Sequence, residues 1–375
     1  MNRRRPRPQA LVAFALAALA LAAVLVGPAA APARPSTSFS VVAAGLMNPR
    51  GLTFGPDGDL YVAEGGDPAG NTMSTTSAQC TQVGEVGPYT AGFTSRISKI
   101  DAQGNRTTVA DHLPSSSTSA DSGSLTSGVA DVAFLDGRLY GIEAGAGCSH
   151  GLLGSHNSIF RVGSGGTTAE IADLSAFQTA NPVANADHCC PPPGDFEPDG
   201  TWYSMVASRG ALYALEPNHG EVDRITADGS ISRVVDVSAT EGHVVPTSLS
   251  VHGVFYFGNL GTFPVAPGSE AIWKLNPNGR LSVVATGLTT VLGTAWQCGR
   301  LYALESVTAA DFPAPGVNPA GTGKVVRVES DGSLTTVVDG LTVPTAMTFG
   351  PDGALYISNF GFGPPTGEIL RVRMS

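Results

Sequence analysis

The chain has 375 residues, of which 42% are hydrophobic and 14% are charged, so it has enough apolar material for a large core and is not a disordered protein. Its formal net charge is −10. A nucleic-acid-binding protein needs clustered Lys and Arg to neutralise phosphates, and no such cluster follows the first few residues, so nucleic acid is not expected as a partner.

The first 33 residues have the parts of a secretory signal peptide. Residues 2–8 read NRRRPRP, residues 11–26 are an unbroken apolar run, and Ala31-Pro32-Ala33 supplies the small residues of a cleavage site. The run is shorter than the roughly 20 residues of a membrane-spanning helix. We therefore expect a secreted protein, extracellular or in the cell envelope, with no membrane span in the mature chain. The alternative is an uncleaved N-terminal anchor.

A sequence unit then recurs six times along the chain. Each copy has a Gly-containing turn, a doublet of the Leu-Tyr type, a variable stretch, a β-rich run with one basic residue, a second turn and a further β-rich run. Gly supplies the positive φ of tight hairpins, and four strands per repeat are typical of a propeller blade. The doublets begin at Leu60, Leu139, Leu212, Phe255, Leu301 and Leu355.

The two ends of the chain complete one another. The sixth copy stops at Ser375 after its third strand, whereas residues 37–46, TSFSVVAAGL, match the fourth-strand pattern and precede the first copy. We expect this N-terminal strand to complete the last blade, which leaves no open sheet edge between the first and last blades. The predicted fold is all-β: one six-bladed β-propeller with four-stranded blades over residues 37–375.

The two faces of this propeller are expected to differ. With strands a to d numbered outward from the axis, the a–b and c–d turns lie on one face, and the b–c loops and blade connections lie on the other, the long-loop face. Binding and catalysis are usual on loops carried by a rigid scaffold. The long segments of this face are 65–94, 144–157, 175–201, 260–270 and 306–322.

Five cysteines in an exported chain permit disulfides and leave at least one thiol unpaired within the monomer. Cys80 and Cys148 lie in insertions of adjacent blades and are predicted to form a disulfide. Cys189 and Cys190 are read as part of a surface loop, because their spacing is not that of a zinc ligand pair. Cys298 is expected to be the unpaired thiol.

A carboxylate or amide stands three residues after the tyrosine of every repeat. At about 4.8 Å between strands, these second-strand positions lie too far apart to share one ion. We predict instead that each caps a strand end by accepting backbone N–H groups from an adjoining loop. The residues are Glu64, Glu143, Glu216, Asn259, Glu305 and Asn359.

The third blade departs most from the repeat, and it brings acids, imidazoles and aromatic rings to the long-loop face in segments 194–205, 215–225 and 239–248. These groups suit a polar ligand, a divalent cation of unspecified identity, or general acid–base chemistry; alternatively, they only shape the loops. The predicted binding residues are Arg50, Trp202, Tyr203, Glu216, His219, Glu221 and His243. If the protein is an enzyme, the predicted catalytic residues are Glu197, Glu216, His219, Glu241 and His243.

Several segments resemble the ScyD/ScyE family of exported propellers. They include NPRGLTFGPDGDLYVAE (48–64), VGPYTAGFTSRISKI (86–100), DFEPDGTWYSMVASRGALYALEPNHGEVDRI (195–225), GNLGTFPVAPGS (258–269) and TTVLGTAW (289–296). The resemblance covers all blades, from about residue 40 to the end of the chain. It implies a six-bladed fold and export and does not specify an activity.

The PDGxLYVA repeat is more distantly similar to NHL-repeat, gluconolactonase-like and quinoprotein sugar dehydrogenase propellers. The lactonase resemblance implies acidic and amide metal ligands where strand a begins. The matching positions lack such ligands: they are Arg50, Ala130, Ser204, Thr247, Leu292 and Thr345.

No GxSxG, HExxH or phosphate-binding Gly loop occurs in the chain. We therefore favour a secreted, non-catalytic module that binds a small polar ligand, a glycan or a protein on its long-loop face. The alternative is a metal-assisted hydrolase or lactonase-like enzyme with its site around blade 3.

Overall fold

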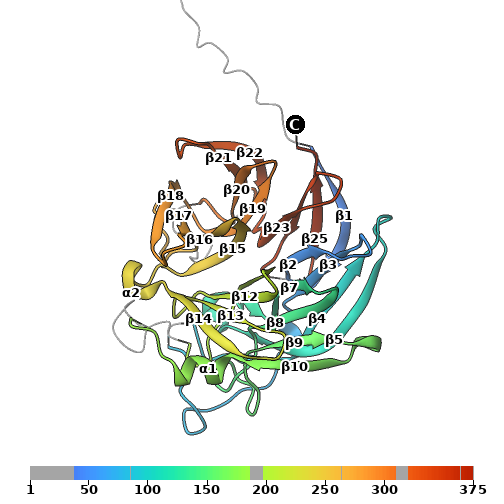
Figure 1. The fold of residues 1–375 in the computed structure, drawn as a ribbon. Helices are drawn as coiled ribbons and strands as arrows, with labels where there is room; N and C mark the ends of the chain where they lie inside the picture. The colour runs from blue at the N-terminus through green and yellow to red at the C-terminus, as the bar shows by residue number, and fades with distance from the viewer. Residues whose placement is uncertain are drawn as a thin grey trace, which may run out of the picture. The chain divides into compact units, whose positions relative to one another are not determined.

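The computed structural model describes residues 38–84, 86–185, 197–262, 264–309, 320–363 and 365–374. These residues form six antiparallel sheets, arranged as the six blades of a β-propeller (Figure 1). The predicted fold class is therefore confirmed. The predicted signal peptide and the Cys189–Cys190 pair lie outside the described residues.

Each blade contributes strands a to d in that order. Blade 1 has β2 (Pro49–Phe54), β3 (Leu60–Glu64), β4 (Thr90–Ile100) and β5 (Arg106–Ser117), with the short β6 (Thr126–Ser127) added at its edge. Blade 2 has β7 (Val129–Leu135), β8 (Arg138–Glu143), β9 (Ser158–Val162) and β10 (Thr168–Asp173). Blade 3 has β11 (Ser204–Ser208), β12 (Ala211–Glu216), β13 (Glu221–Ile225) and β14 (Ile231–Asp236).

The second half of the ring follows the same plan. Blade 4 has β15 (Pro246–His252), β16 (Val254–Asn259), β17 (Glu270–Leu275) and β18 (Leu281–Leu288). Blade 5 has β19 (Val291–Gln297), β20 (Arg300–Glu305), β21 (Gly323–Val328) and β22 (Leu334–Leu341). Blade 6 has β23 (Ala346–Phe349), β24 (Leu355–Asn359), β25 (Gly367–Val372) and β1 (Phe39–Leu46).

Blade 6 joins the two ends of the chain, as the sequence predicts. Strand β1 is antiparallel to β25, with register pairs from Phe39↔Val372 to Leu46↔Gly367. In Figure 1 the blue β1 therefore lies beside the red β25. Strand β23 in turn contacts β2 of blade 1, which completes the ring.

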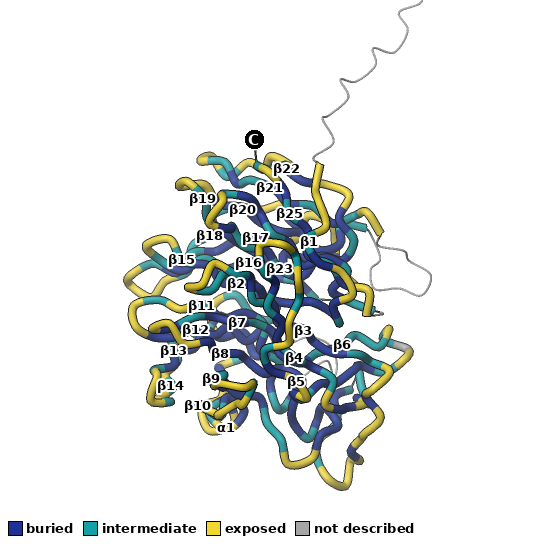
Figure 2. Tube along the Cα trace, turned by 90° about the vertical axis from the view of Figure 1, so that its right-hand side faces the viewer, coloured by how far each residue is buried: buried dark blue, intermediate teal, exposed yellow. Residues whose placement is uncertain are grey.

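Burial decreases from the inner strands to the outer ones. Strand β12 is buried along its whole length, because neighbouring blades cover both faces of its sheet. The outermost strands β1 and β22 are largely exposed, and the two buried residues of each strand pack against the neighbouring blade. Figure 2 shows buried positions along the strands and exposed ones at the turns.

Tight turns close the face opposite the long loops. In the first a–b turn, Gly55 N–H donates to Asp59 O at 2.8 Å, and Gly58 has φ +84°, a conformation that favours glycine. This pattern explains the repeated Pro-Asp-Gly motif.

Short helices occur only in the connections of the described chain. The two α-helices are α1 (Leu174–Ala180) and α2 (Ser238–Glu241), and the 3₁₀ helices are η1 (Pro68–Gly70), η2 (Ala120–Ser122) and η3 (Ser164–Gly166). Helix α1 begins where the Asp173 carboxylate accepts from Ala176 N–H at 2.8 Å. Within the described ranges, no helix has the length and hydropathy needed to cross a membrane.

Candidate functional site

The repeated carboxylates and amides are structural, as the sequence predicts. Glu64 Oε2 accepts from Met47 N–H at 2.6 Å, in the connection that leads into blade 1. The same bond recurs elsewhere in the ring: Thr201 N–H donates to Glu216 Oε1, Thr289 N–H to Glu305 Oε1 and Thr342 N–H to Asn359 Oδ1, at 2.8–2.9 Å. These side chains therefore fix the blade connections.

A cavity of about 200 Å³ opens at the centre of the long-loop face. It is bounded by loops from all six blades, and aromatic and aliphatic side chains form much of its wall. Its polar groups are hydroxyls, the Asn218 amide and one carboxylate, that of Glu197. Apolar or aromatic wall residues include Tyr89, Leu125, Tyr203, Leu260, Leu292 and Phe362. We call this cavity the long-loop pocket.

Three loop segments hold Glu197 in this wall. The Tyr89 hydroxyl, from the insertion of blade 1, donates to Glu197 Oε1 at 2.5 Å. Glu197 N–H donates to Asn218 Oδ1 at 2.8 Å, and His219 Nε2 donates to Glu197 O at 3.2 Å. Tyr89, Glu197 and His219 are each 6% exposed, so the loops form a packed wall.

The imidazole of His150 lies beside this carboxylate. Its Nδ1 donates to Ala146 O at 2.7 Å, and its Nε2 lies 3.8 Å from Glu197 Oε2. Burial opposes the charged imidazole, but the nearby Glu197 carboxylate, with the charge of Asp199, raises the pKa of His150 above its usual value. Glu197 Oε2 makes no hydrogen bond to any of the described residues.

The predicted disulfide holds the His150 loop against blade 1. Cys80 and Cys148 are bonded, with their Cα atoms 6.0 Å apart, so this prediction is confirmed. Thr75 Oγ1 donates to Cys148 O at 2.7 Å, which ties the two insertions together next to the bridge. Cys298 is free and exposed, as expected.

Several predicted binding residues lie elsewhere. Trp202 is fully buried and packs in the hydrophobic core of blades 2 and 3. Glu221 is buried in an ion pair with Arg233, and its Oε1 accepts from Gln178 at 3.1 Å. Of the seven predicted binding residues, Tyr203 lines the long-loop pocket, and the roles of the others stay predictions.

The predicted catalytic groups come together only in part. Glu197, Glu216 and His219 meet at the turn after β12, where Glu216 Oε2 accepts from His219 N–H. Glu241 and His243 lie half-buried in and after α2 and do not line the pocket. Among the described residues, no three His, Cys, Asp or Glu side chains are grouped as a metal site would require. The predicted divalent cation therefore has no set of ligands within the described ranges.

A layer of side chains crosses the axis below the pocket. The Tyr203 hydroxyl of blade 3 donates to Thr345 O at 2.8 Å, next to β23 of the opposite blade. Arg50 is 4% exposed, donates to Gly361 O at 2.7 Å and to Thr126 O, and lies 4.2 Å from the centre of the Phe362 ring. The predicted binding residue Arg50 is therefore part of this layer.

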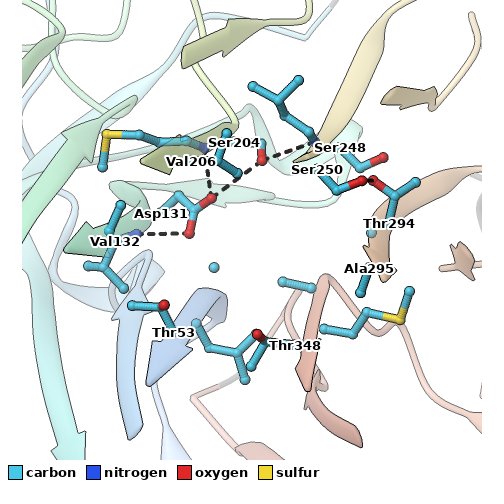
Figure 3. Close-up of a pocket in the computed structure, with 18 of the residues that line it drawn as sticks. Thr53, Asp131, Val132, Ser204, Val206, Ser248, Ser250, Thr294, Ala295 and Thr348 are labelled. Carbon is cyan, nitrogen blue, oxygen red and sulfur yellow. Dashed lines mark hydrogen bonds between the residues drawn. The ribbon is translucent and has the colours of Figure 1, made fainter. Parts of the chain in front are cut away.

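A second cavity, the central channel, lies on the other side of this layer and has a volume of about 560 Å³. Strand a of every blade lines it, and Asp131 of β7 is the one ionisable side chain among its described lining residues. Asp131 Oδ1 accepts from Val132 N–H and Oδ2 from Met205 N–H, both at 2.8 Å (Figure 3). Burial raises the pKa of Asp131 to about 7, against these hydrogen bonds.

Sequence reasoning missed Asp131 because it compared only the first residue of each strand a. A bulge between Val129 and Asp131 shifts the register of β7 at this position. Gly51 of the neighbouring blade provides the space: a Cβ atom there would lie 1.9 Å from Asp131 Oδ1. In the sequence, the one sign of this site was an acidic residue, Asp131, within the predicted first strand of blade 2, with Gly51 at the matching place in blade 1.

Comparisons with solved structures agree on the architecture. The chain is similar to a candidate glucose dehydrogenase from Thermus thermophilus (16% identity, TM-score 0.54, 90% of this chain and 100% of that chain). It is also similar to a protein of unknown function from Bacteroides thetaiotaomicron (12%, 0.55, 89% and 76%) and to a candidate gluconolactonase (14%, 0.50, 92% and 94%). At these identities the likeness shows the propeller fold alone.

Neither protein-family models nor curated proteins match the sequence.

Proposed function

We propose that this protein is a secreted, non-catalytic binding module of the ScyD/ScyE type, with residues 1–33 as its signal peptide and residues 37–375 as its propeller domain. The observation that carries the proposal is the long-loop pocket, in which loops from several blades hold the buried Glu197 carboxylate at the wall of a largely apolar cavity. Concave, mostly apolar cavities with a few placed polar groups are typical ligand sites.

The pocket suits a small, mainly apolar ligand with one hydrogen-bond donor. Tyr89, Leu260 and Phe362 offer apolar and aromatic surface, and the Glu197 carboxylate is the one charged acceptor among the described lining residues. Such a ligand is less polar than the ligand classes expected from the sequence. A cavity of about 200 Å³ is too small to hold a glycan chain or a protein. A partner of either kind would contact the loops around the pocket instead.

The hydrolase alternative is not favoured. Glu216 caps the connection into blade 3, and His219 supports the Glu197 backbone, so both side chains have structural roles. We expect gluconolactone hydrolysis to stay at the background rate, with and without Ca²⁺ or Zn²⁺. Turnover above background that is lost in His219→Ala would reverse this ranking.

Benzyl alcohol, with toluene as the donor-free analogue, tests the pocket. Saturation-transfer NMR and titration calorimetry are expected to show that wild-type protein binds benzyl alcohol more tightly than toluene. Leu260→Trp fills the cavity and should abolish binding of both. Glu197→Gln should reduce the preference for benzyl alcohol, because a hydrogen bond to a charged acceptor contributes about 1.5–3 kcal/mol.

The matched control is Asp339→Asn, which removes an exposed acid on the outer strand of blade 5. This variant should bind both probes as the wild type does. If neither probe binds, or if Leu260→Trp binds as well as the wild type, the long-loop pocket is not a ligand site of this kind.

A further inference from the structure

Asp131 is the one ionisable side chain in the described lining of the central channel, and the protein provides no opposite charge for its ionised form. No Lys, Arg or His side chain forms an ion pair with Asp131 within the described chain, and both carboxylate oxygens accept only from uncharged donors. Asp131 is partly exposed in the channel, and an ionised carboxylate that protein shields in part from water is costly unless an opposite charge or a full set of hydrogen bonds stabilises it. Oδ2 accepts from two of these donors, whereas Oδ1 accepts from Val132 N–H alone and keeps a lone pair for a further donor.

Hydroxyl groups surround the free volume in front of this carboxylate. Figure 3 shows Thr53 on β2 of the neighbouring blade 1 and Thr348 on β23 of blade 6, both beside the channel that Asp131 faces. These two hydroxyls make no hydrogen bond to the described protein. The Ser250 and Thr294 hydroxyls, 2.9 Å apart, complete a polar wall from blades 4 and 5.

We propose that the central channel is a second binding site, which takes a small polyhydroxylated amine in its protonated form, with the ammonium group on Asp131 and the ligand hydroxyls on the Ser and Thr side chains. An ammonium group has three N–H donors and no acceptor. It therefore suits a carboxylate that already receives backbone N–H bonds and faces further hydroxyl oxygens. The cavity of about 560 Å³ leaves room for a chain of several carbons.

The charge distinguishes this ligand from a neutral polyol. A polyol offers hydroxyls to the channel wall but leaves the ionised Asp131 without an opposite charge, whereas an ammonium group supplies that charge. Ammonium binding selects the ionised carboxylate, so it must compete with the proton that Asp131 otherwise takes up.

Few other charged groups face Asp131. Along the axis the next titratable side chain is Tyr203, beyond which lies Arg50 in the layer below the long-loop pocket. The other blades contribute only uncharged described residues to the channel lining. At the rim, His252 stacks on the lining residue Trp296 with 4.3 Å between ring centres. The part of a pH dependence between pH 5 and 8 that is lost in Asp131→Asn, in which His252 remains, is therefore assigned to Asp131.

Glucamine (1-amino-1-deoxysorbitol) and sorbitol form a matched pair of probes, because they differ only in an ammonium group in place of one hydroxyl. Titration calorimetry of the full-length protein at pH 5, 6, 7 and 8 is the measurement. We expect glucamine affinity to rise up to tenfold per pH unit from pH 5 and to level off above about pH 7, where Asp131 is ionised. Sorbitol should bind at least tenfold more weakly at pH 8.

Two variants locate the site. Asp131→Asn should reduce glucamine affinity at pH 8 at least tenfold and remove the pH dependence. Thr53→Val with Thr348→Val keeps the shape of the channel, so it should weaken glucamine several-fold while leaving the pH dependence in place. This second variant keeps the test valid if Asp131→Asn does not fold.

Equal affinity for sorbitol and glucamine, or pH-independent glucamine binding in the wild type, would overturn the proposal. So would unchanged glucamine binding in folded Asp131→Asn. The long-loop pocket is filled by Leu260→Trp, and this variant should bind glucamine as the wild type does, which separates the two sites.

Discussion

The two cavities lie on one axis and are built in different ways. The long-loop pocket is made by insertions and connections that differ from blade to blade, and Glu197 is held there by Tyr89, Asn218 and His219. The central channel is made by strand a of every blade, and its carboxylate is held by backbone N–H groups of two adjacent strands.

This difference shows which parts of the chain are constrained by packing of the ring and which parts can vary to bind a ligand. Strand a must pack around the axis in any blade, so the channel has a repetitive wall with one exceptional side chain. The loops are free of that constraint, so their side chains can be arranged around one carboxylate. Tyr203 belongs to both regions, because it lines the pocket and crosses to Thr345 at the end of the channel.

The largest expected effect on stability comes from the disulfide beside the long-loop pocket. Replacing Cys80 and Cys148 by Ser opens a crosslink between residues 68 apart, which should lower the free energy of unfolding by about 2–4 kcal/mol. Urea unfolding followed by circular dichroism measures this change. Benzyl alcohol binding should fall as well, because the bridge holds the His150 loop, while glucamine binding to the folded variant should not change.

If benzyl alcohol and glucamine lose affinity equally in this double variant, the long-loop pocket and the central channel are not independent sites. A control is Cys298→Ser, which alters an exposed thiol on the other face and should change stability by less than about 0.5 kcal/mol.

The second prediction concerns the central channel and the pH dependence of the free energy of unfolding. Burial raises the pKa of Asp131 from 3.8 to about 7, so the folded protein binds a proton there more tightly than the unfolded chain does. This group therefore makes the protein more stable at low pH, and that stability is lost as the pH rises from about 4 to about 7. Three pH units correspond to about 4 kcal/mol, and water in the channel should reduce this to about 2 kcal/mol.

Asp131→Asn should flatten this part of the stability profile, measured by urea unfolding between pH 4 and 8. The buried Glu143 and Asp223 carboxyls, whose pKa values burial raises to about 8, give a slope of the same sign. His150, whose pKa is also raised, contributes stability that is lost as the pH rises. These groups remain in the variant, so the difference between the two profiles isolates Asp131. Parallel profiles would mean that Asp131 ionises as it does in water.

The smallest expected effect is that of a single hydroxyl in the pocket. Tyr89→Phe keeps the ring, which packs edge-on against His150 with 4.9 Å between ring centres, but removes the hydrogen bond to Glu197. The loss should be about 1–2 kcal/mol of unfolding free energy, because the buried carboxylate loses a donor. Thermal unfolding at pH 7 measures it. A neutral result would show that water replaces the hydroxyl.

The sequence predicted the blades well because each repeats one pattern. The Leu-Tyr doublets, the turn glycines and the fourth-strand pattern of residues 37–46 were sufficient to place the strands and the closure of the ring. The caps formed by Glu64 and its equivalents followed from distance alone, because side chains on six second strands cannot reach one ion.

The sites were predicted less well because they depend on contacts between loops. Glu197 was a candidate, but Tyr89 and Asn218 were not, since nothing in an irregular insertion indicates which side chain turns toward the axis. Trp202 was expected to bind a ligand because it is a large aromatic residue in a loop segment, yet it fills the core of blades 2 and 3. Asp131 depended on a local bulge in β7.

The pairing of β1 with β25 also constrains the order of folding. The two strands are separated by most of the chain, so their pairing carries a large loop-closure entropy and must follow the synthesis of residues 367–372. Blades 1 to 5 are each made from one continuous segment, so most of their contacts form between neighbours in sequence. Ring closure is thus expected to be the slow step of folding, since long-range pairings form slowly. Until it occurs, β25 presents an unpaired edge to any other chain nearby.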